Sequence, residues 1–418
     1  MMEKNTSNKG HLSILEKANL FCLTYIMLWT YVPVFSMYTS QGIFRIIYAL
    51  IVLIWCVTAL DKANFTQVRL FGLMCIFLFI MLIYLFIGYG NASIYSMIEY
   101  ILFLGFVMNS IYYLKNDNLW IFRYIVILIL ICSIITSITT LWGLANNGNA
   151  ARLLTSSSVS SEITAQLESQ NIGAFDFIYG GCLIIVPLFS ALKAKLPIII
   201  RVLCLLASIL YVVVILRSNF TIALVVLFLD GVLWFISLGK TKIQKCIIVM
   251  ICIISINFLP IIMNVFFEIA LSQTDSIYAA NKISKLLSVL NGTSSLGDTT
   301  IRFQLLLNSL NSFFENPIFG KGAIYTMNDS GIIGQHAQFV DDLARFGLLG
   351  GIFLLSFLIG AIKKINRMLR NEFVVPTIIF VCLGFLNPLF YDGILSAYFI
   401  CVPALYWLIN YYNNLEDL

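Results

Sequence analysis

The stretch LWIFRYIVILILICSIITSITTL, residues 119–141, decides the class of this protein. It is mostly apolar, and Arg123, near its start, is its single charged residue. As a helix it is long enough to cross the roughly 30 Å hydrocarbon core of a bilayer. A strand of a membrane barrel would alternate apolar and polar residues instead. The stretch therefore predicts a transmembrane helix.

The composition of the whole chain gives the same result. Of 418 residues, 60% are hydrophobic and only 11% are charged, whereas a soluble domain carries about 25% charged residues. The mean hydropathy is +0.95. So few charges cannot cover a water-facing surface, which excludes a soluble globular protein and a disordered one. We expect an all-α, polytopic integral membrane protein.

Working outward from residues 119–141, similar apolar stretches recur along the chain. Each predicts one membrane-spanning helix, about twelve in all. The predicted spans are residues 19–38, 43–60, 68–87, 93–113, 119–141, 171–192, 197–216, 219–238, 246–266, 340–361, 373–390 and 393–411.

The basic residues orient this set of helices. Most of the 25 lysines and arginines fall in alternate connections and in the N-terminal tail, and cationic loops stay cytoplasmic. We therefore expect both termini in the cytoplasm. The net charge of +5 fits contact with anionic membrane lipid and is not a nucleic-acid signal.

The spans divide the chain into five parts. They are a cytoplasmic tail (1–18), helices 1–9 with an outer loop at 142–170 (19–266), a large extracytoplasmic loop (267–339), helices 10–12 (340–411) and a cytoplasmic tail (412–418). The Ser/Asn-rich loop at 142–170 is expected to be polar and irregular.

The large loop carries two amphipathic patterns. Apolar residues recur at i, i+3, i+4 and i+7 in 282–290 and again in 301–314, which predicts two helices that lie on the outer membrane surface or over the bundle. They form either a structural lid or a lid that contributes to a site.

Three residues are candidates for catalysis. His336 could act as a general base, because its ordinary pKa of about 6.5 lets it accept a proton near neutrality; it could equally cap a helix. Arg217 could bind a pyrophosphate through its guanidinium fork or reach lipid phosphate. Arg302 could do the same or form an ion pair with Asp298.

Four further residues are assigned to substrate binding. Arg345 and Asp342 lie in the first turns of the tenth predicted span, where an acid also complements the helix dipole. Asp176 lies near the outer end of the sixth span, and Lys321 lies in the large loop.

No cofactor is expected. The chain has no Walker A loop, no Rossmann fingerprint and no pairing of histidines or cysteines at metal-ligand spacing. All ten cysteines fall within predicted spans and are expected to pack as small apolar residues.

The segment from Thr300 to Gly350 resembles the O-antigen ligase/polymerase superfamily of bacterial membrane proteins. The resemblance rests on Arg302 at the start of a hydrophobic helix, ENPIFGKG at 315–322, and His336 followed 11 residues later by Gly347 of FGLLGG. It extends to about twelve spans, a large late outer loop and Arg217 opening the eighth span. The first outer loop departs from some members, since residues 142–170 carry Arg152 as their single basic residue.

The resemblance implies a GT-C-like, metal-independent glycosyltransferase in the bacterial cytoplasmic membrane. Its donor is an oligosaccharide on undecaprenyl pyrophosphate, and His336, Arg217 and Arg302 match the family's functional positions. A polymerase would join repeat units into O-antigen, capsule or exopolysaccharide, with a flippase and a chain-length regulator as partners. A ligase would transfer the glycan to a lipid core instead.

A secondary transporter or lipid-glycan flippase is the alternative of another class. Twelve spans are typical of transporters, and Asp230 or Glu99 could carry the coupling charge. Such a protein should show internal repeats or helices broken within the membrane.

Overall fold

The computed structural model describes most of the chain. The described residues are 13–39, 43–60, 65–89, 94–155, 160–238, 297–322, 337–370 and 372–414, with isolated positions 241, 244, 284 and 333. Within these ranges the structure is helical and contains no strand. The elements are α1 (Ile14–Tyr31), α2 (Pro33–Thr39), α3 (Ile43–Thr58), α4 (Phe65–Phe86), α5 (Ile94–Asn116), α6 (Leu119–Asn146), α7 (Ala150–Leu153), α8 (Ser161–Ser169), α9 (Phe175–Lys193), α10 (Ile198–Arg217), α11 (Thr221–Leu238), α14 (Gly297–Glu315), α15 (Gln338–Met368), α16 (Val374–Leu386), α17 (Asp392–Ser396), the π-helix η2 (Ala397–Cys401) and α18 (Val402–Asn414).

Seven segments of the described chain are long and apolar enough to cross a membrane. They are Gln67–Phe86, Met97–Asn116, Leu119–Asn146, Phe175–Lys193, Ile198–Arg217, Gln338–Met368 and Asp392–Asn414. Three shorter apolar helices accompany them: Ile46–Thr58, Thr221–Ile236 and Val374–Leu386. The predicted all-helical fold is therefore confirmed within the described residues, and these apolar helices agree with a polytopic membrane protein. The count of twelve stays a prediction. The predicted span at 246–266 lies outside the described residues.

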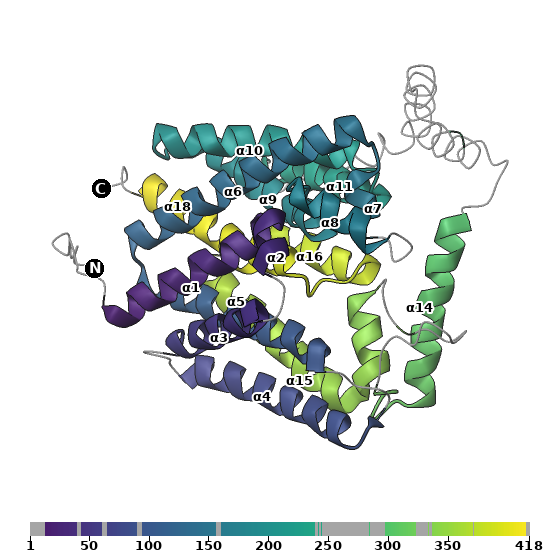
Figure 1. Cartoon of the computed structure of the whole chain (residues 1–418). Coiled ribbons are helices and arrows are strands. Elements are labelled where there is room, and N and C mark those ends of the chain that lie inside the picture. Colours follow the sequence, from purple (N-terminus) through teal and green to yellow (C-terminus); the bar gives the residue numbers. More distant parts are fainter. Residues whose placement is uncertain are drawn as a thin grey trace.

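The long helices pack roughly side by side, and the bundle has two distinct ends (Figure 1). At one end α1 begins and α18 ends; we call it the terminal end. Here the indole N–H of Trp407 donates to Asp117 Oδ1 at 2.8 Å, and the Lys195 N–H donates to Asn413 Oδ1 at 3.4 Å. At the opposite end stands α14, packed along α15 (Figure 1); we call it the α14 end.

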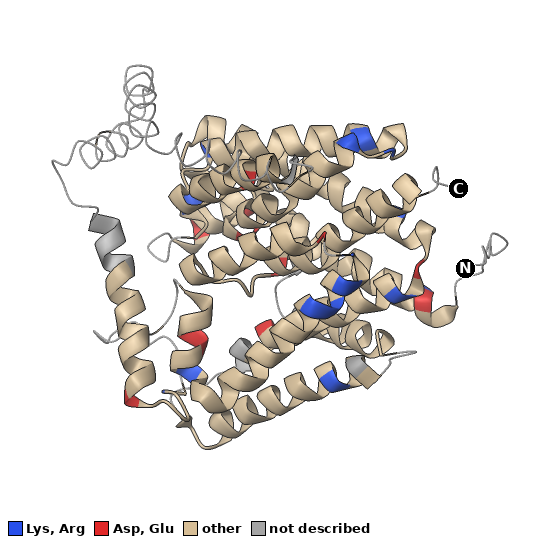
Figure 2. Cartoon of the chain, turned by 180° about the vertical axis from the view of Figure 1, so that it is seen from behind, with Lys and Arg blue, Asp and Glu red and all other residues tan. Residues whose placement is uncertain are grey.

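The described charges are distributed unevenly between these ends. Lysines and arginines gather mainly in the half of the bundle that carries the chain ends, while several acids lie among the helices (Figure 2). The described basic residues that we expect on one side of the membrane thus lie mainly at one end of the bundle.

Buried polar side chains help to hold the apolar helices together. The amide of Asn19 in α1 donates to Asn109 Oδ1 in α5 at 2.7 Å and to Thr58 Oγ1 in α3 at 2.9 Å, and all three residues are buried. In an apolar surrounding such bonds between helices replace the hydrophobic driving force that water supplies to soluble proteins.

Several predicted segments differ from the structure. The first span is divided at Pro33, which ends α1 because proline has no backbone N–H. Residues 142–170 are largely helical, in α6, α7 and α8, because Ala150, Ala151 and Leu167 give the polar run a face to bury. The last span consists of α17, the π-helix and α18 in succession.

The large loop is described only in part. The second predicted amphipathic helix is confirmed as α14, which ends just before Pro317. Its apolar residues Phe303, Leu307 and Phe314 are exposed, while Ser309 is fully buried, so the small polar face is the one that packs inward. Apart from position 284, the first predicted helix lies outside the described residues.

Candidate functional site

The site is built around a break in α15. The predicted span 340–361 is not one continuous helix, because Gly347 has φ 59° and ψ −162° and divides α15 into a short first half and a long second half. This backbone conformation favours glycine strongly. Backbone groups released by such a break must find other partners, since lipid offers none.

Residues of ENPIFGKG supply those partners to the second half. The Leu348 N–H donates to the carbonyl oxygen of Pro317 at 2.8 Å, and the Leu349 N–H donates to that of Ile318 at 2.9 Å. Both donors follow Gly347, where the helical pattern of hydrogen bonds is interrupted.

The same segment also caps the first half. The Lys321 N–H donates to the carbonyl oxygen of Ala344 at 2.9 Å, and the Gly322 N–H donates to that of Arg345 at 2.8 Å. ENPIFGKG is therefore joined by reciprocal backbone hydrogen bonds to FGLLGG and to the two residues that precede it.

Glycine permits this close approach. A Cβ on Gly320 would lie 2.4 Å from the carbonyl oxygen of Arg345, and a Cβ on Gly347 would lie 2.4 Å from that of Ile318. Real Cβ atoms do not approach other atoms so closely, so larger residues would force the segments apart.

Tyrosines at the end of α4 and just after it also hold this segment, through hydrogen bonds to two of its carbonyl oxygens. The hydroxyl of Tyr84 donates to the carbonyl oxygen of Phe319 at 2.7 Å, and that of Tyr89 donates to the carbonyl oxygen of Gly320 at 2.8 Å. We call this arrangement of ENPIFGKG against the break in α15 the interlock; through the two tyrosines it is attached to the rest of the bundle.

The short first half of α15 carries a buried polar face. Asp342 Oδ1 accepts hydrogen bonds from the Tyr100 hydroxyl of α5 at 2.7 Å and from the Gln338 amide at 3.0 Å. The Arg345 guanidinium lies 3.9 Å from the same oxygen. Asp342 and Arg345 are 3% and 5% exposed, so each offsets part of the cost of burying the other's charge.

Asp341, the neighbouring acid, joins α15 to α14. Its Oδ2 accepts the Ala337 N–H at 3.1 Å, which caps the start of α15, and its Oδ1 accepts the Ser309 hydroxyl of α14 at 2.7 Å. The helix-start role expected for the acids is therefore filled by Asp341, while Asp342 belongs to the polar face.

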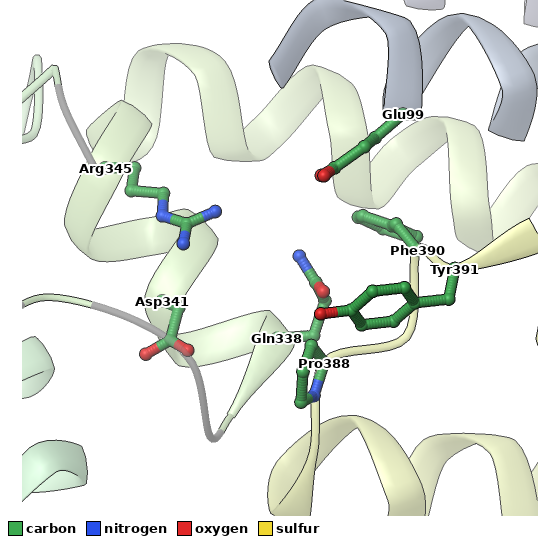
Figure 3. A pocket seen from close by; sticks show the side chains of 7 residues that line it. All are labelled: Glu99, Gln338, Asp341, Arg345, Pro388, Phe390 and Tyr391. Atoms are coloured by element: carbon green, nitrogen blue, oxygen red, sulfur yellow. The ribbon is translucent and has the colours of Figure 1, made fainter. Parts of the chain in front are cut away.

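A small cavity of about 30 Å³ opens beside this face. Figure 3 shows Glu99 and Arg345 approaching it from opposite sides, with Tyr391 and Gln338 between them. Its lining residues come from α5, α15 and the connection after α16: Glu99, Gln338, Asp341, Arg345, Pro388, Phe390 and Tyr391. The volume is enough for one or two water molecules or a few polar atoms of a larger ligand.

The connection after α16 is held against the cavity by Gln338. Its side-chain oxygen accepts the Leu389 N–H at 3.0 Å, and its backbone N–H donates to the Asn387 carbonyl oxygen at 3.4 Å. The predicted span 373–390 consequently ends early, at Leu386, and the residues after it form part of the site.

A second acidic pair lies next to this connection. Asp392 accepts a hydrogen bond from the Tyr48 hydroxyl at 2.9 Å. A Cβ on Gly393 would lie 2.9 Å from Asp176 Oδ2, so the starts of α17 and α9 meet closely. Asp176 does not line the cavity. Its neighbour Phe175 packs against the cavity-lining Tyr391, with the two ring centroids 5.3 Å apart.

The other predicted site residues occupy different positions. Lys321 lies in the interlocked segment and pairs with Glu315 at 2.6 Å. Arg217 is the last residue of α10, is exposed and is not among the cavity-lining residues. Arg302 belongs to α14, but its side chain and all of His336 lie outside the described residues. The structure thus brings Asp342 and Arg345 together, while the catalytic roles of His336, Arg302 and Arg217 stay predictions.

Part of the site was not predicted from the sequence. Gln338, Asp341, Asp342 and Arg345 stand at i, i+3, i+4 and i+7, and such a polar helical face at the start of an apolar span is a readable signal. The contribution of Tyr391 has no such signal, because it depends on packing between distant segments.

The residues that line the cavity offer a polar ligand both hydrogen-bond donors and hydrogen-bond acceptors. Arg345 and Gln338 are hydrogen-bond donors, while Glu99 and Asp341 offer carboxylate oxygens. Within the described part of the chain, no group of three or more histidine, cysteine or acidic residues could hold a metal ion.

No family model matches the chain, and no curated protein matches it significantly. The resemblance to the O-antigen ligase/polymerase superfamily therefore stands on the residues quoted for it.

Proposed function

We propose that this protein is a membrane glycosyltransferase that polymerises oligosaccharide repeat units carried on undecaprenyl pyrophosphate. The supporting observation is the interlock of ENPIFGKG with FGLLGG at Gly347. It gives the two strings of the resemblance a common structural purpose, because together they position the buried polar face of α15 beside a cavity at the α14 end.

The proposed reaction is a displacement at the anomeric carbon of the donor. A hydroxyl of the acceptor sugar forms the new C–O bond, while the bond to the pyrophosphate breaks and its electron pair leaves with the phosphate oxygen. His336 takes the hydroxyl proton. Arg217 and Arg302 stabilise the departing negative charge, as other electrostatic clamps do.

The residues of the cavity are assigned to substrate binding. Arg345, oriented by Asp342, offers its guanidinium to sugar oxygens or phosphate. Asp176 and Lys321 support the surrounding segments. The proposal includes twelve spans in a bacterial cytoplasmic membrane, both termini in the cytoplasm, and a flippase and a chain-length regulator as partners.

The test is the length pattern of the surface glycan in the source cell. Deleting the gene should leave single repeat units, and the wild-type chain should restore the ladder. His336→Ala and Arg302→Ala should insert normally and fail to restore it. Arg201→Ala, an exposed arginine near the start of α10, is the matched control and should behave as wild type. A normal ladder from both site variants would overturn the proposal.

The acceptor separates a polymerase from a ligase. A ligase variant of the proposal predicts that long glycan still forms on the lipid carrier after deletion, but is not transferred to the lipid core. Extraction of lipid-linked glycan distinguishes the two outcomes.

A transporter or flippase is the second candidate, and specific features favour it. The break at Gly347 and the π-helix Ala397–Cys401 are discontinuities in long apolar segments, and such discontinuities accompany transport sites. Purified protein in liposomes should then move lipid-linked glycan between leaflets without forming glycosidic bonds. Glycan extension in the same liposomes, with no movement between leaflets, would exclude this candidate.

A further inference from the structure

Asp230 is a carboxyl group near the middle of the apolar helix α11. It is 1% exposed, and neither carboxylate oxygen has a hydrogen-bond partner among the described residues. A bare carboxylate in such a place is very costly, whereas the neutral acid is tolerated much better. The surroundings of Asp230 therefore determine whether it holds a proton.

Among the described residues, the helices packed around α11 bring no cation to Asp230. Cys182 of α9 and Tyr406 of α18 are the titratable groups close enough to interact with it electrostatically. Lys193, at the end of α9, lies instead over the ring of Trp234, 4.4 Å from its centroid. On α10, the Tyr211 hydroxyl is hydrogen-bonded to Ser133, and Arg201 and Arg217 lie at the two ends of the helix. Helix α16 contributes no charged side chain.

Polar groups lead from Asp230 toward the terminal end. The Tyr406 hydroxyl is hydrogen-bonded to Ser190 and interacts electrostatically with both Asp230 and Glu372. One turn further along α18, Asn410 is hydrogen-bonded to Glu372. Asp230 and Glu372 thus both lie near one face of α18, with the Tyr406 hydroxyl close enough to interact with each.

Glu372 lies between α15 and α16, outside the spans, and can exchange protons with water. Its side chain is partly buried, and Oε2 has no hydrogen-bond partner among the described residues. Burial raises the pKa of the Glu372 carboxyl, against the lowering effects of Asn410 and Arg370. It therefore binds and releases protons closer to neutrality than an ordinary glutamate does.

We propose that Asp230 is a proton-binding site within the membrane, and that protons reach it from the terminal end through Glu372 and Tyr406. In each step one oxygen accepts a proton and the preceding group releases one, so Asp230 carboxylate becomes the neutral acid and no other reactant is needed. The proposal goes beyond the glycosyl transfer that we propose for the α14 end.

Infrared difference spectroscopy of the full chain in lipid tests the proposal directly. A neutral carboxylic acid has a C=O stretch that a carboxylate lacks, and this band shifts when the proton is replaced by deuterium. The wild-type spectrum minus that of Asp230→Asn should contain such a band at neutral pH. After transfer into deuterated buffer, the rate of the shift reports proton access to Asp230.

Substitutions at Tyr406 and Glu372 are compared by the rate at which the acid band shifts in deuterated buffer. Tyr406→Phe should slow the shift roughly tenfold, as a rise of about 1.4 kcal/mol in the barrier would, and Glu372→Gln should slow it in the same direction. Tyr211→Phe, another buried tyrosine whose hydroxyl is bonded to Ser133 Oγ at 2.9 Å, is the control and should leave the rate unchanged.

Two results would overturn the proposal. If Asp230→Asn removes no acid band, Asp230 is ionised and does not bind a proton at neutral pH. If Tyr406→Phe and Glu372→Gln exchange as fast as wild type, the proton reaches Asp230 by another route. Glycan extension by Asp230→Asn is measured alongside, and its retention would separate the proton site from the transferase proposal.

Discussion

At the residue scale, the most informative position is Gly347. It combines φ 59° with a Cβ direction that points at the carbonyl oxygen of Ile318 at 2.4 Å, so both the backbone and the available space demand glycine. Gly320 meets the same restriction from the other side, against Arg345. The break in α15 is therefore specified by single residues on both segments.

Replacing Gly347 with alanine should destabilise the protein by about 1–3 kcal/mol, because the new Cβ meets strain and a backbone oxygen together. The measurement is thermal unfolding of the purified protein in detergent. Gly72→Ala in α4 is the matched control, since a Cβ there meets nothing within 4 Å. Equal melting temperatures for Gly347→Ala and Gly72→Ala would contradict the assigned break.

At the scale of elements, the contact between α14 and α15 depends on a small polar surface. Buried Ser309 and Ser312 face inward, while Phe303 and Phe314 are exposed. The apolar periodicity correctly predicted that 301–314 forms a helix. It did not identify the packed face, because an apolar side chain in a membrane protein can face lipid as well as protein.

Ser309→Ala should loosen α14 by about 1 kcal/mol, because the hydrogen bond from its hydroxyl to Asp341 Oδ1 is lost. Hydrogen exchange of the α14 amides should become roughly fivefold faster. Asn311→Ala, an exposed position on the same helix, should leave the exchange unchanged. Unaltered exchange in Ser309→Ala would show that this bond does not hold the helix.

At the scale of the whole molecule, the charge pattern makes a prediction about orientation. The basic terminal end should face the cytoplasm, because cationic segments are retained there, and the α14 end should face outward. Fusions of a fluorescent protein after residue 418 should fluoresce. Fusions of alkaline phosphatase within residues 267–339 should be active. The reverse pattern would place the cavity on the cytoplasmic side.

How much of the site the sequence could reveal depends on whether the relevant contacts are local. The face formed by Gln338, Asp341, Asp342 and Arg345 follows from helical spacing. The cavity does not, because Glu99 of α5 and Tyr391 after α16 reach it only through the packing of distant helices. Asp230 was visible as an acid in an apolar span, but the lack of a bonded partner among described residues is a tertiary property.

The sequence by itself determined the membrane class, the helical character of the apolar stretches and the separation of basic residues to one end, since these properties depend on composition and on periodicity within a single segment. Only the tertiary structure decided that α15 is broken at Gly347, that ENPIFGKG supplies the missing hydrogen bonds and that α5, α15 and the connection after α16 enclose a cavity. The physical reason is that these features require backbone groups and side chains far apart in the chain to satisfy one another, and no local pattern specifies which ones will meet.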